Sequence, residues 1–174
     1  MVETLRPVRS VLRGVGADVP KKWVHILNMT LEELYCGKKY YFRVVRYRQS
    51  GRKTVVPLEL FVSPGTSAGT EIVIDDVGNE RKDGTIQAIV FVVKELKHEK
   101  FRRLQDDLLM EVRLPWVDSL REETGEVYFH SVDGKEYGFT VDYHKNLLLG
   151  GTAVIPDAGM PSPSGGGRGR VVIR

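Results

Sequence analysis

Apolar residues recur mainly at every second position of this chain, which is the period of side chains along a β-strand. The segment 23–29 is the clearest example. One of its faces holds Trp23, His25, Leu27 and Met29, and the other holds Val24 and Ile26. Because both faces carry apolar side chains, we expect both to be at least partly buried. Similar patterns predict strands at 40–48, 55–62, 70–74, 86–96, 107–114, 126–131, 135–143 and 170–173.

Two of these strands carry a signal about their place in a sheet. Pro57 lies inside the segment 55–62 and has no amide proton to donate, so this strand is expected at a sheet edge. The segment 86–96 is a nearly continuous apolar run without clean alternation. That pattern predicts a strand that is buried on both faces.

One short helix interrupts the strands. Thr30 and Glu33 have the spacing of a capping box, in which each side chain accepts from the backbone amide of the other residue. Leu31 and Leu34 then fall on one helical face, and Gly37 is suited to the left-handed conformation that ends a helix. The sequence therefore predicts about two helical turns, followed directly by the strand 40–48.

The order of strand, short helix and strands occurs a second time. The strand 107–114 leads to Pro115, which suits the first position of a helix, and then to a helical pattern over 116–120. Gly125 is expected to end this helix before the strand 126–131. Asp133 and Gly134 then predict a type I′ hairpin turn.

This repetition predicts a mostly β fold of two tandem β-sandwich-like subdomains, each with one short helix. Residues 22–96 form the first subdomain and residues 97–174 form the second, with the charged segment 97–103 as the junction. Residues 1–21 have little sustained period, so we expect a loose leader in which a short helix over Leu5–Leu12 is the available regular element.

Composition narrows the class of protein. The 174 residues are 41% hydrophobic and 28% charged, as in an ordinary globular domain. No apolar run approaches the ~20 residues of a membrane span, and the beginning of the chain lacks the apolar run of a signal peptide. We therefore expect the protein in the cytosol or nucleus, without membrane association. The single cysteine, Cys36, allows no internal disulfide and no cysteine-based zinc site.

The charge is unevenly distributed along the chain. Residues 1–60 hold 12 Lys and Arg against 5 Asp and Glu, a net charge of +7, whereas the whole chain has a net charge of +3. The first subdomain is therefore expected to favour an acidic partner, such as a carboxylate-rich peptide or a phosphate backbone.

Catalytic chemistry finds little support in the sequence. The four histidines are scattered, and no two of them have the spacing of metal ligands. The acidic pairs are adjacent in sequence, so their side chains diverge on a helix or a strand. The glycine-rich segment 165–170 does not lead from a strand into a helix, which disfavours a phosphate loop. We predict no enzyme, no cofactor and no metal.

An apolar set on three strands has two interpretations. Spacing of two residues places these side chains on common faces, and pattern alone is typical of core. A groove for an extended peptide would use the same arrangement, because such a peptide pairs with a sheet edge while alternate side chains enter apolar pockets. The set is His25, Leu27, Met29, Phe42, Val44 and Phe91.

Five motifs in order resemble the C-terminal substrate-binding region of the DnaJ-like J-domain co-chaperones of the zinc-finger-less class. They span roughly residues 22 to 174. The motifs are LEELYCGKK, SPGTSAGTEIVI, KHEKFRRLQDDLL, SVDGKEY and DAGMPSPSGGGRGRVVI.

The resemblance implies a client-binding chaperone module. Its groove would use Leu27, Phe42, Val44 and Phe91, to which strand parity adds His25 and Met29. A basic rim of Lys38, Lys39 and Arg43 would hold the acidic Glu-Glu-Val-Asp tail of the seventy-kilodalton heat-shock chaperone. A solvated strand edge is the plain alternative for these three residues.

Departures from the family pattern also matter. The J domain with its His-Pro-Asp signature and the CxxCxGxG repeats are missing, and Gln105 stands where the family has a glycine. The chain stops where family members continue into a dimerisation segment, so we expect a monomer that binds unfolded clients passively.

A basic β module that binds single-stranded nucleic acid is the alternative function. Tyr40, Tyr41, Phe42 and Tyr47 alternate with arginines, as in proteins that stack bases on aromatic rings. The resemblance disfavours nucleic acid as a partner. A comparison of single-stranded RNA with an acidic peptide separates the two.

Overall fold

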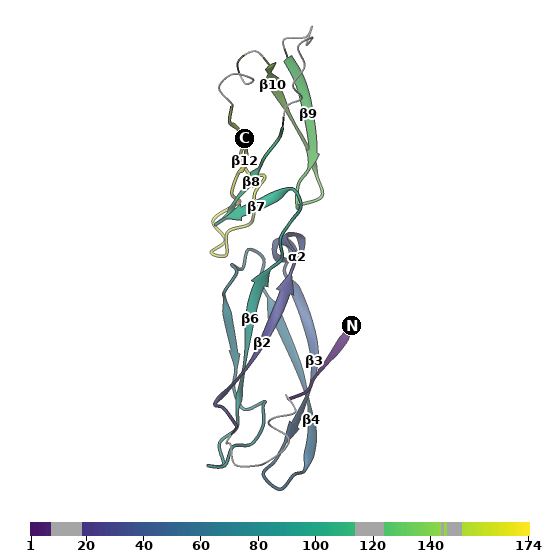
Figure 1. Ribbon diagram of the computed structural model, residues 1–174, viewed down its shortest axis with the longest axis vertical. Helices are drawn as coiled ribbons and strands as arrows, with labels where there is room; N and C mark the ends of the chain where they lie inside the picture. Colours follow the sequence, from purple (N-terminus) through teal and green to yellow (C-terminus); the bar gives the residue numbers. More distant parts are fainter. Residues whose placement is uncertain (8–18, 114–123, 144, 146–150) are drawn as a thin grey trace. The chain divides into compact units, whose positions relative to one another are not determined.

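Strands make up most of the chain in the computed structural model, which describes residues 1–7, 19–113, 124–143, 145 and 151–174 (Figure 1). The mostly β class is confirmed. The chain divides into two compact units, each described here by itself. The first comprises Met1–Met29, Lys38–Val62 and Thr66–Glu95, and the second comprises Thr30–Gly37, Ser63–Gly65 and Leu96–Arg174.

Two three-stranded sheets form the first unit. One sheet has the order β1-β3-β4 and the other has the order β2-β6-β5. Strand β3 runs parallel to β1 and antiparallel to β4, while β6 runs parallel to β2 and antiparallel to β5. The strands are β1 (Val2–Leu5), β2 (Lys22–Met29), β3 (Lys38–Tyr47), β4 (Lys53–Val62), β5 (Glu71–Ile74) and β6 (Ala88–Glu95).

Aromatic and aliphatic side chains join these two sheets face to face. The ring of Phe42 on β3 stacks on that of Phe91 on β6, with centroids 5.1 Å apart. Both rings are almost fully buried, as are Val44 and Val93 on the same strands. The first unit is therefore a sandwich whose core lies between β3 and β6.

The positional signals of β4 and β6 are confirmed. Strand β4 carries Pro57 and lies at a sheet edge, where the missing amide proton is not needed on the outer side. Strand β6 is the central strand of its sheet, and Ile89, Val90 and Phe91 are buried in succession. A continuous apolar run therefore marked a strand covered on both faces.

The expected leader contains a strand. Residues Val2–Leu5 form β1, so Leu5, the first residue of the helix expected over Leu5–Leu12, lies in a strand. The reason is pairing with β3, a partner from a distant part of the chain that local periodicity does not reveal. The remainder of that expected helix, residues 8–12, lies outside the described residues.

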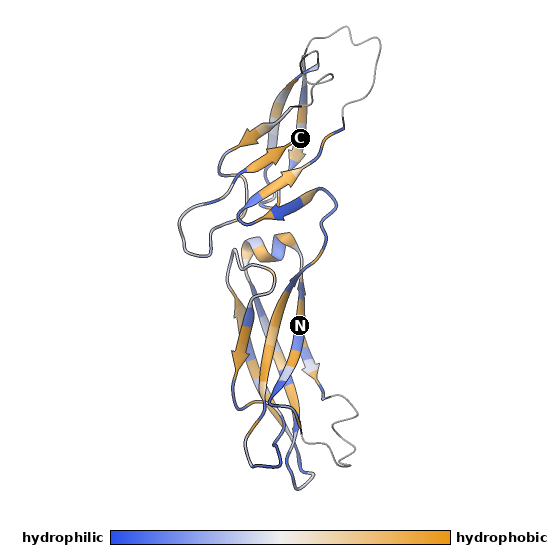
Figure 2. Cartoon of the chain, turned by 60° about the vertical axis from the view of Figure 1, so that its left-hand side comes forward, coloured by the Kyte–Doolittle hydropathy of each residue, from blue (hydrophilic) through white to orange (hydrophobic). Residues whose placement is uncertain are grey.

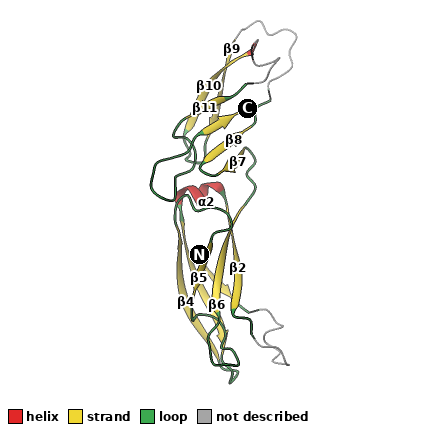
Figure 3. Cartoon of the chain, turned by 90° about the vertical axis from the view of Figure 1, so that its left-hand side faces the viewer, coloured by secondary structure: helices red, strands yellow, loops and turns green. Residues whose placement is uncertain are grey.

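The second unit consists of a four-stranded sheet, a β-hairpin and the helix. The sheet has the order β11-β12-β8-β7. Strands β12 and β8 are parallel, whereas β11 is antiparallel to β12 and β7 is antiparallel to β8. Figure 3 shows the helix in red and the strands in yellow. The elements are α2 (Leu31–Cys36), β7 (Phe101–Leu104), β8 (Asp107–Met110), β9 (Thr124–His130), β10 (Glu136–Asp142), β11 (Ala153–Ile155) and β12 (Val171–Ile173).

The predicted capping box is confirmed. The Glu33 amide donates to Thr30 Oγ1 over 3.2 Å, and the Thr30 amide donates to Glu33 Oε2 over 3.1 Å. Gly37 ends the helix at φ 76° and ψ 159°, a region open almost only to glycine. Helix α2 belongs with the second unit, whereas the linear boundaries 22–96 and 97–174 assign it to the first.

Several expectations in the second unit need correction. The segment 97–103 is not only a junction, because Phe101–Leu104 forms β7. Gly125, which was expected after the end of a helix, lies inside β9. The helix expected at 116–120 lies outside the described residues.

The β9–β10 turn also differs from the predicted type I′ form. Gly134 has a positive φ of 76°, but Asp133 does not, whereas type I′ needs both. Asp133 instead accepts the Lys135 amide on Oδ1 over 2.9 Å, so its side chain stabilises a longer loop between His130 and Glu136.

Candidate functional site

The predicted groove residues come together in the first unit, but inside the sandwich. Phe42, Val44 and Phe91 are at most 2% exposed, and Leu27 and Met29 at most 3%. Only the His25 side chain, at 25%, reaches the surface. Their burial matches the core interpretation that the sequence left open, so a peptide could meet this cluster only where His25 opens it to solvent.

The His25 ring is the partly exposed member of a cluster of aromatic rings. It packs edge-on against Phe42 at 5.7 Å and against Phe91 at 5.8 Å. The Tyr40 ring also stacks on Phe42, with centroids 5.7 Å apart. One residue of β2, two of β3 and one of β6 thus share one aromatic cluster, which fixes how the two sheets face each other.

Strand β1 lies beside this cluster, and no periodicity in the sequence predicts it. It pairs with Tyr41–Val44 of β3, with Leu5 opposite Val44. Leu5 is 4% exposed, and the Glu3 carboxylate lies 3.9 Å from His25 Nε2. An extended segment therefore already occupies the edge of β3 beside the aromatic cluster.

The three predicted rim residues lie on both faces of β3. The Lys38 ammonium lies 4.9 Å from the centre of the Tyr40 ring, on the face that carries Phe42. Lys39 and Arg43 are exposed on the opposite face, and Lys39 Nζ pairs with Glu59 Oε1 on β4 at 3.0 Å. Only Lys39 and Arg43 therefore form a common exposed basic surface.

The aromatic residues of the nucleic-acid alternative do not form one platform. Tyr40 and Phe42 belong to the cluster between the sheets, whereas Tyr41 is exposed on the other face of β3. Base stacking needs several exposed rings in a row. The arrangement of these rings gives the alternative no support.

Exposed apolar side chains flank a buried one on the outer face of the other sheet. Val24 on β2 and Val73 on β5 are the direct register neighbours of Val90 on β6, which is 2% exposed. Val24 and Val73 are 58% and 45% exposed, and Ile26 beside them is 51% exposed. The expectation that both faces of 23–29 are at least partly buried fails for Val24 and Ile26, because their side chains face away from the sandwich core. The apolar colouring of these strands is visible in Figure 2.

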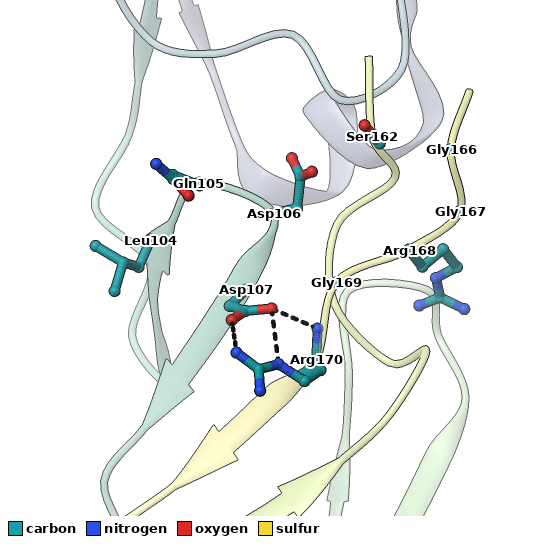
Figure 4. A pocket seen from close by; sticks show the side chains of 10 residues that line it. All are labelled: Leu104, Gln105, Asp106, Asp107, Ser162, Gly166, Gly167, Arg168, Gly169 and Arg170. Atoms are coloured by element: carbon teal, nitrogen blue, oxygen red, sulfur yellow. Dashed lines mark hydrogen bonds and ion pairs between the residues drawn. The ribbon is translucent and has the colours of Figure 1, made fainter. Parts of the chain in front are cut away.

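In the second unit, a polar cavity of about 390 Å³ lies between the β7–β8 turn and the loop 162–170 (Figure 4). Two of its charged side chains, Asp107 and Arg170, form an ion pair. Arg170 Nη2 contacts Asp107 Oδ2 at 2.7 Å, and the Arg170 amide donates to Asp107 Oδ1 over 2.8 Å. The hydrogen bonds from Arg170 lower the pKa of Asp107 although partial burial opposes this. This ion pair in the cavity wall joins the beginning of β8 to the residue just before β12.

Arg168 turns away from this pair and fastens the loop to the β9–β10 hairpin. Its Nη2 contacts Asp133 Oδ2 at 3.0 Å and donates to the Gly159 carbonyl over 3.0 Å. The Tyr137 hydroxyl donates to the same Asp133 oxygen over 2.7 Å. Burial opposes ionisation of Asp133, but these bonds and the Lys135 amide outweigh it and lower its pKa.

His98 organises the beginning of β7. Its Nδ1 accepts the amides of Lys100 and Phe101 at 3.1 and 3.0 Å. Nε2 must then carry the proton, and it lies 3.0 Å from Glu32 Oε1 of α2. Each of these polar contacts joins parts of the second unit, and none positions a nucleophile or a general base.

Among the described residues, no group of three His, Cys, Asp or Glu side chains could hold a metal ion. Cys36 is exposed and carries a free thiol. No described helix is long and apolar enough to cross a membrane. The candidate site is the β3 edge in the first unit, which β1 already occupies in part.

The chain matches the family model of the DnaJ C terminal domain over residues 23–174. It is 34% identical to Protein psi1 of Schizosaccharomyces pombe over 152 residues, which cover 84% of this chain and 39% of that protein. It is 27% identical to Protein SIS1 of Saccharomyces cerevisiae over 150 residues, covering 85% and 42%. Mitochondrial protein import protein MAS5 of the same yeast is 30% identical over 117 residues, covering 67% and 28%. The chain spans about two fifths of the first two relatives.

Proposed function

Because this chain belongs to the DnaJ C terminal domain family, we propose that it is a non-enzymatic chaperone module that binds unfolded or extended polypeptide. The binding site is the edge of β3, where a client strand takes main-chain hydrogen bonds. The observation that carries the proposal is strand β1, because it is an extended segment already paired with that edge.

The apolar cluster contributes to client binding where it reaches the surface, at His25. His25 is the partly exposed member, and its ring contacts both Phe42 and Phe91. A client side chain that points between the sheets meets His25 first and the cluster behind it. The core behind His25 contains the buried side chains of Leu27, Met29 and Val44.

The acidic tail of the seventy-kilodalton heat-shock chaperone is the second ligand we propose. Arg43 and Lys39 are exposed on the outer face of β3, next to the edge where an extended peptide pairs. Lys38, on the other face, contributes charge at the end of the same strand. Such exposed charges attract a carboxylate-rich peptide through screened Coulomb forces, so binding is expected to weaken as salt increases.

Fluorescence anisotropy with labelled peptides tests both parts. An extended peptide with alternating apolar residues should bind, and a Glu-Glu-Val-Asp peptide should bind in a salt-dependent way. Changing Lys38, Lys39 and Arg43 together to alanine should weaken binding of the acidic peptide and make that binding less dependent on salt. The matched control changes the exposed residues Lys94, Lys97 and Lys100 to alanine, which alters net charge equally.

The outcomes separate the alternatives. Equal loss in the two triple variants would mean that only net charge matters and would remove the proposed tail site. Preference for single-stranded RNA over both peptides would favour the nucleic-acid function. Failure of every peptide to bind would overturn the chaperone proposal.

A further inference from the structure

Two aromatic rings are exposed on the outer face of the sheet β1-β3-β4, the face turned away from the sandwich core. Tyr41 on β3 is 45% exposed and Phe61 on β4 is 53% exposed. Tyr41 lies opposite Glu59 and Phe61 lies opposite Lys39, so the two rings are diagonal neighbours on one face of the antiparallel pair. RNA-binding sheets stack two or three bases on exposed rings arranged in this way.

Positive charge surrounds these rings. Arg43 is exposed on the same face of β3, and in the described part of the chain no carboxylate pairs with it. Lys39 lies on this face as well and pairs with Glu59. Over the whole β3–β4 hairpin, Lys38–Val62, seven Lys and Arg stand against one acidic residue. The rings therefore lie within a surface that attracts phosphate groups.

The turn of this hairpin carries a second group of cations. Arg52 and Lys53 are exposed, and Arg48 is half-buried. None of the three forms an ion pair with a described carboxylate. Gly51 in this turn has open space where a Cβ would lie, so the backbone of the turn is accessible. Phosphates of a strand that continues past the rings can therefore pair with these cations.

The hairpin β9–β10 follows β8 in the second unit as β3–β4 follows β2 in the first, but its charge is opposite. Its residues Thr124–Asp142 include four acidic residues and one lysine. It also exposes a ring, Tyr128, which is 60% exposed. The Tyr128 hydroxyl donates to Glu126, and this bond and the charge of Glu136 raise the pKa of Tyr128. An exposed ring thus occurs in both hairpins, whereas a basic setting occurs only in β3–β4.

We propose that the outer face of the β3–β4 hairpin binds single-stranded nucleic acid, with bases stacked on Tyr41 and Phe61 and phosphates paired with Arg43 and the cations of the turn. This inference goes beyond the proposed function and does not rest on it. Every base has a π-face, so such stacking tolerates any sequence. A duplex stacks its bases on one another and leaves no face for the rings, so the ligand is an unpaired strand.

The rings are tested with a labelled oligouridine of about twelve nucleotides, measured by fluorescence anisotropy on the full chain. Tyr41→Leu and Phe61→Leu each keep an apolar side chain on the strand but remove the ring, and each should weaken binding about tenfold. Tyr128→Leu removes the exposed ring of the acidic hairpin and should leave binding unchanged. Wild-type affinity in either Tyr41→Leu or Phe61→Leu would overturn the proposal.

The cations are tested by the salt dependence of the same binding. For a single strand, the slope of log K against log salt is about 0.7 for each phosphate contact. Changing Arg48, Arg52 and Lys53 together to alanine should therefore make the slope shallower by about 2, whereas the two ring variants should lower affinity and keep the slope. The lysine triple variant that is the control for the acidic peptide should also keep the slope. An equal change of slope in both triple variants would mean that only net charge matters, which contradicts the proposal.

Two competing ligands decide what the face recognises. Polyglutamate of the same length carries charge without bases, and double-stranded RNA carries phosphates with its bases hidden. Both should bind more weakly than oligouridine, and equal binding of either would show that no base stacks on the rings. If oligouridine fails to bind while the extended apolar peptide binds, this inference is wrong and the proposed function stands. The reverse result would keep this inference and remove the proposed function.

Discussion

Different interactions stabilise the interior of each of the two units. In the first, large rings between two sheets form the core, with Phe42 stacked on Phe91. In the second, polar side chains fasten loops to strands, with Arg168 on Asp133 and Arg170 on Asp107. The first arrangement depends on buried area, whereas the second depends on charge and on hydrogen-bond geometry.

Close backbone approach makes the second arrangement possible. A Cβ on Gly169 would lie 2.0 Å from the Asp106 carbonyl oxygen, and one on Gly159 would lie 2.6 Å from it. The loop 157–169 therefore lies directly on the β7–β8 turn, where no side chain fits between them. The comparison teaches that a small sheet with a modest apolar core is completed by polar contacts across glycines. The sandwich has one such contact, where Gly78 lies against Gln87, but the rings between its sheets form its centre.

The largest effect should come from the ring at the centre of the first unit. The substitution Phe91→Ala removes a fully buried side chain and should cost about 3–5 kcal/mol of the free energy of unfolding. Hydrogen exchange followed by mass spectrometry should show lost protection in β2, β3 and β6, with little change in β8 and β12. Val73→Ala, in the same sheet but 45% exposed, is the control and should have a small effect. Equal loss in both units would mean that they unfold as one.

An intermediate effect is expected in the second unit. The substitution Asp133→Asn leaves Arg168 without its carboxylate and should cost about 1–3 kcal/mol, read as lost protection in β9 and β10. The lowered pKa of Asp133 stabilises the fold above the ordinary value of 3.8, and this contribution disappears as pH falls through the lower folded value.

Acid should therefore act on the two units unequally. The second unit should lose protection below about pH 4, before the first. The Asp133→Asn variant should show a shallower acid transition in the second unit, whereas Glu111→Gln, an exposed carboxyl in the same unit, should keep the steep one. An identical acid transition in wild type and Asp133→Asn would show that this ion pair does not stabilise the loop.

The smallest effect is expected from relieving backbone strain at Gln105 in the second unit. Gln105 has φ +57° in the β7–β8 turn, a conformation that side chains other than glycine rarely adopt. Gln105→Gly should raise the melting temperature through a gain of a few tenths to about 1 kcal/mol, since relief of strain exceeds the added entropy of the unfolded chain. Leu104→Gly, next to it in a β7 strand conformation, should be destabilising. A loss of stability in both variants would mean that the turn is not strained.

Local chemistry was enough for much of the fold. The capping box of Thr30 and Glu33, the edge position of the Pro57 strand and the buried run of β6 each follow from a few neighbouring residues, and each is confirmed. The ordered motifs indicated the family, and the family model covers residues 23–174. These features are local because capping, ladder donation and side-chain alternation act within one element.

Tertiary structure decided the rest. Parity placed Phe42, Val44 and Phe91 on common faces, but whether a face lies under another sheet or under solvent depends on partners far along the chain, and here it is buried. The same reason explains why Val24 and Ile26 are exposed, and why Val2–Leu5 forms a strand where no periodicity predicted one. Periodicity determined which residues share a face, and only long-range pairing determined what covers it.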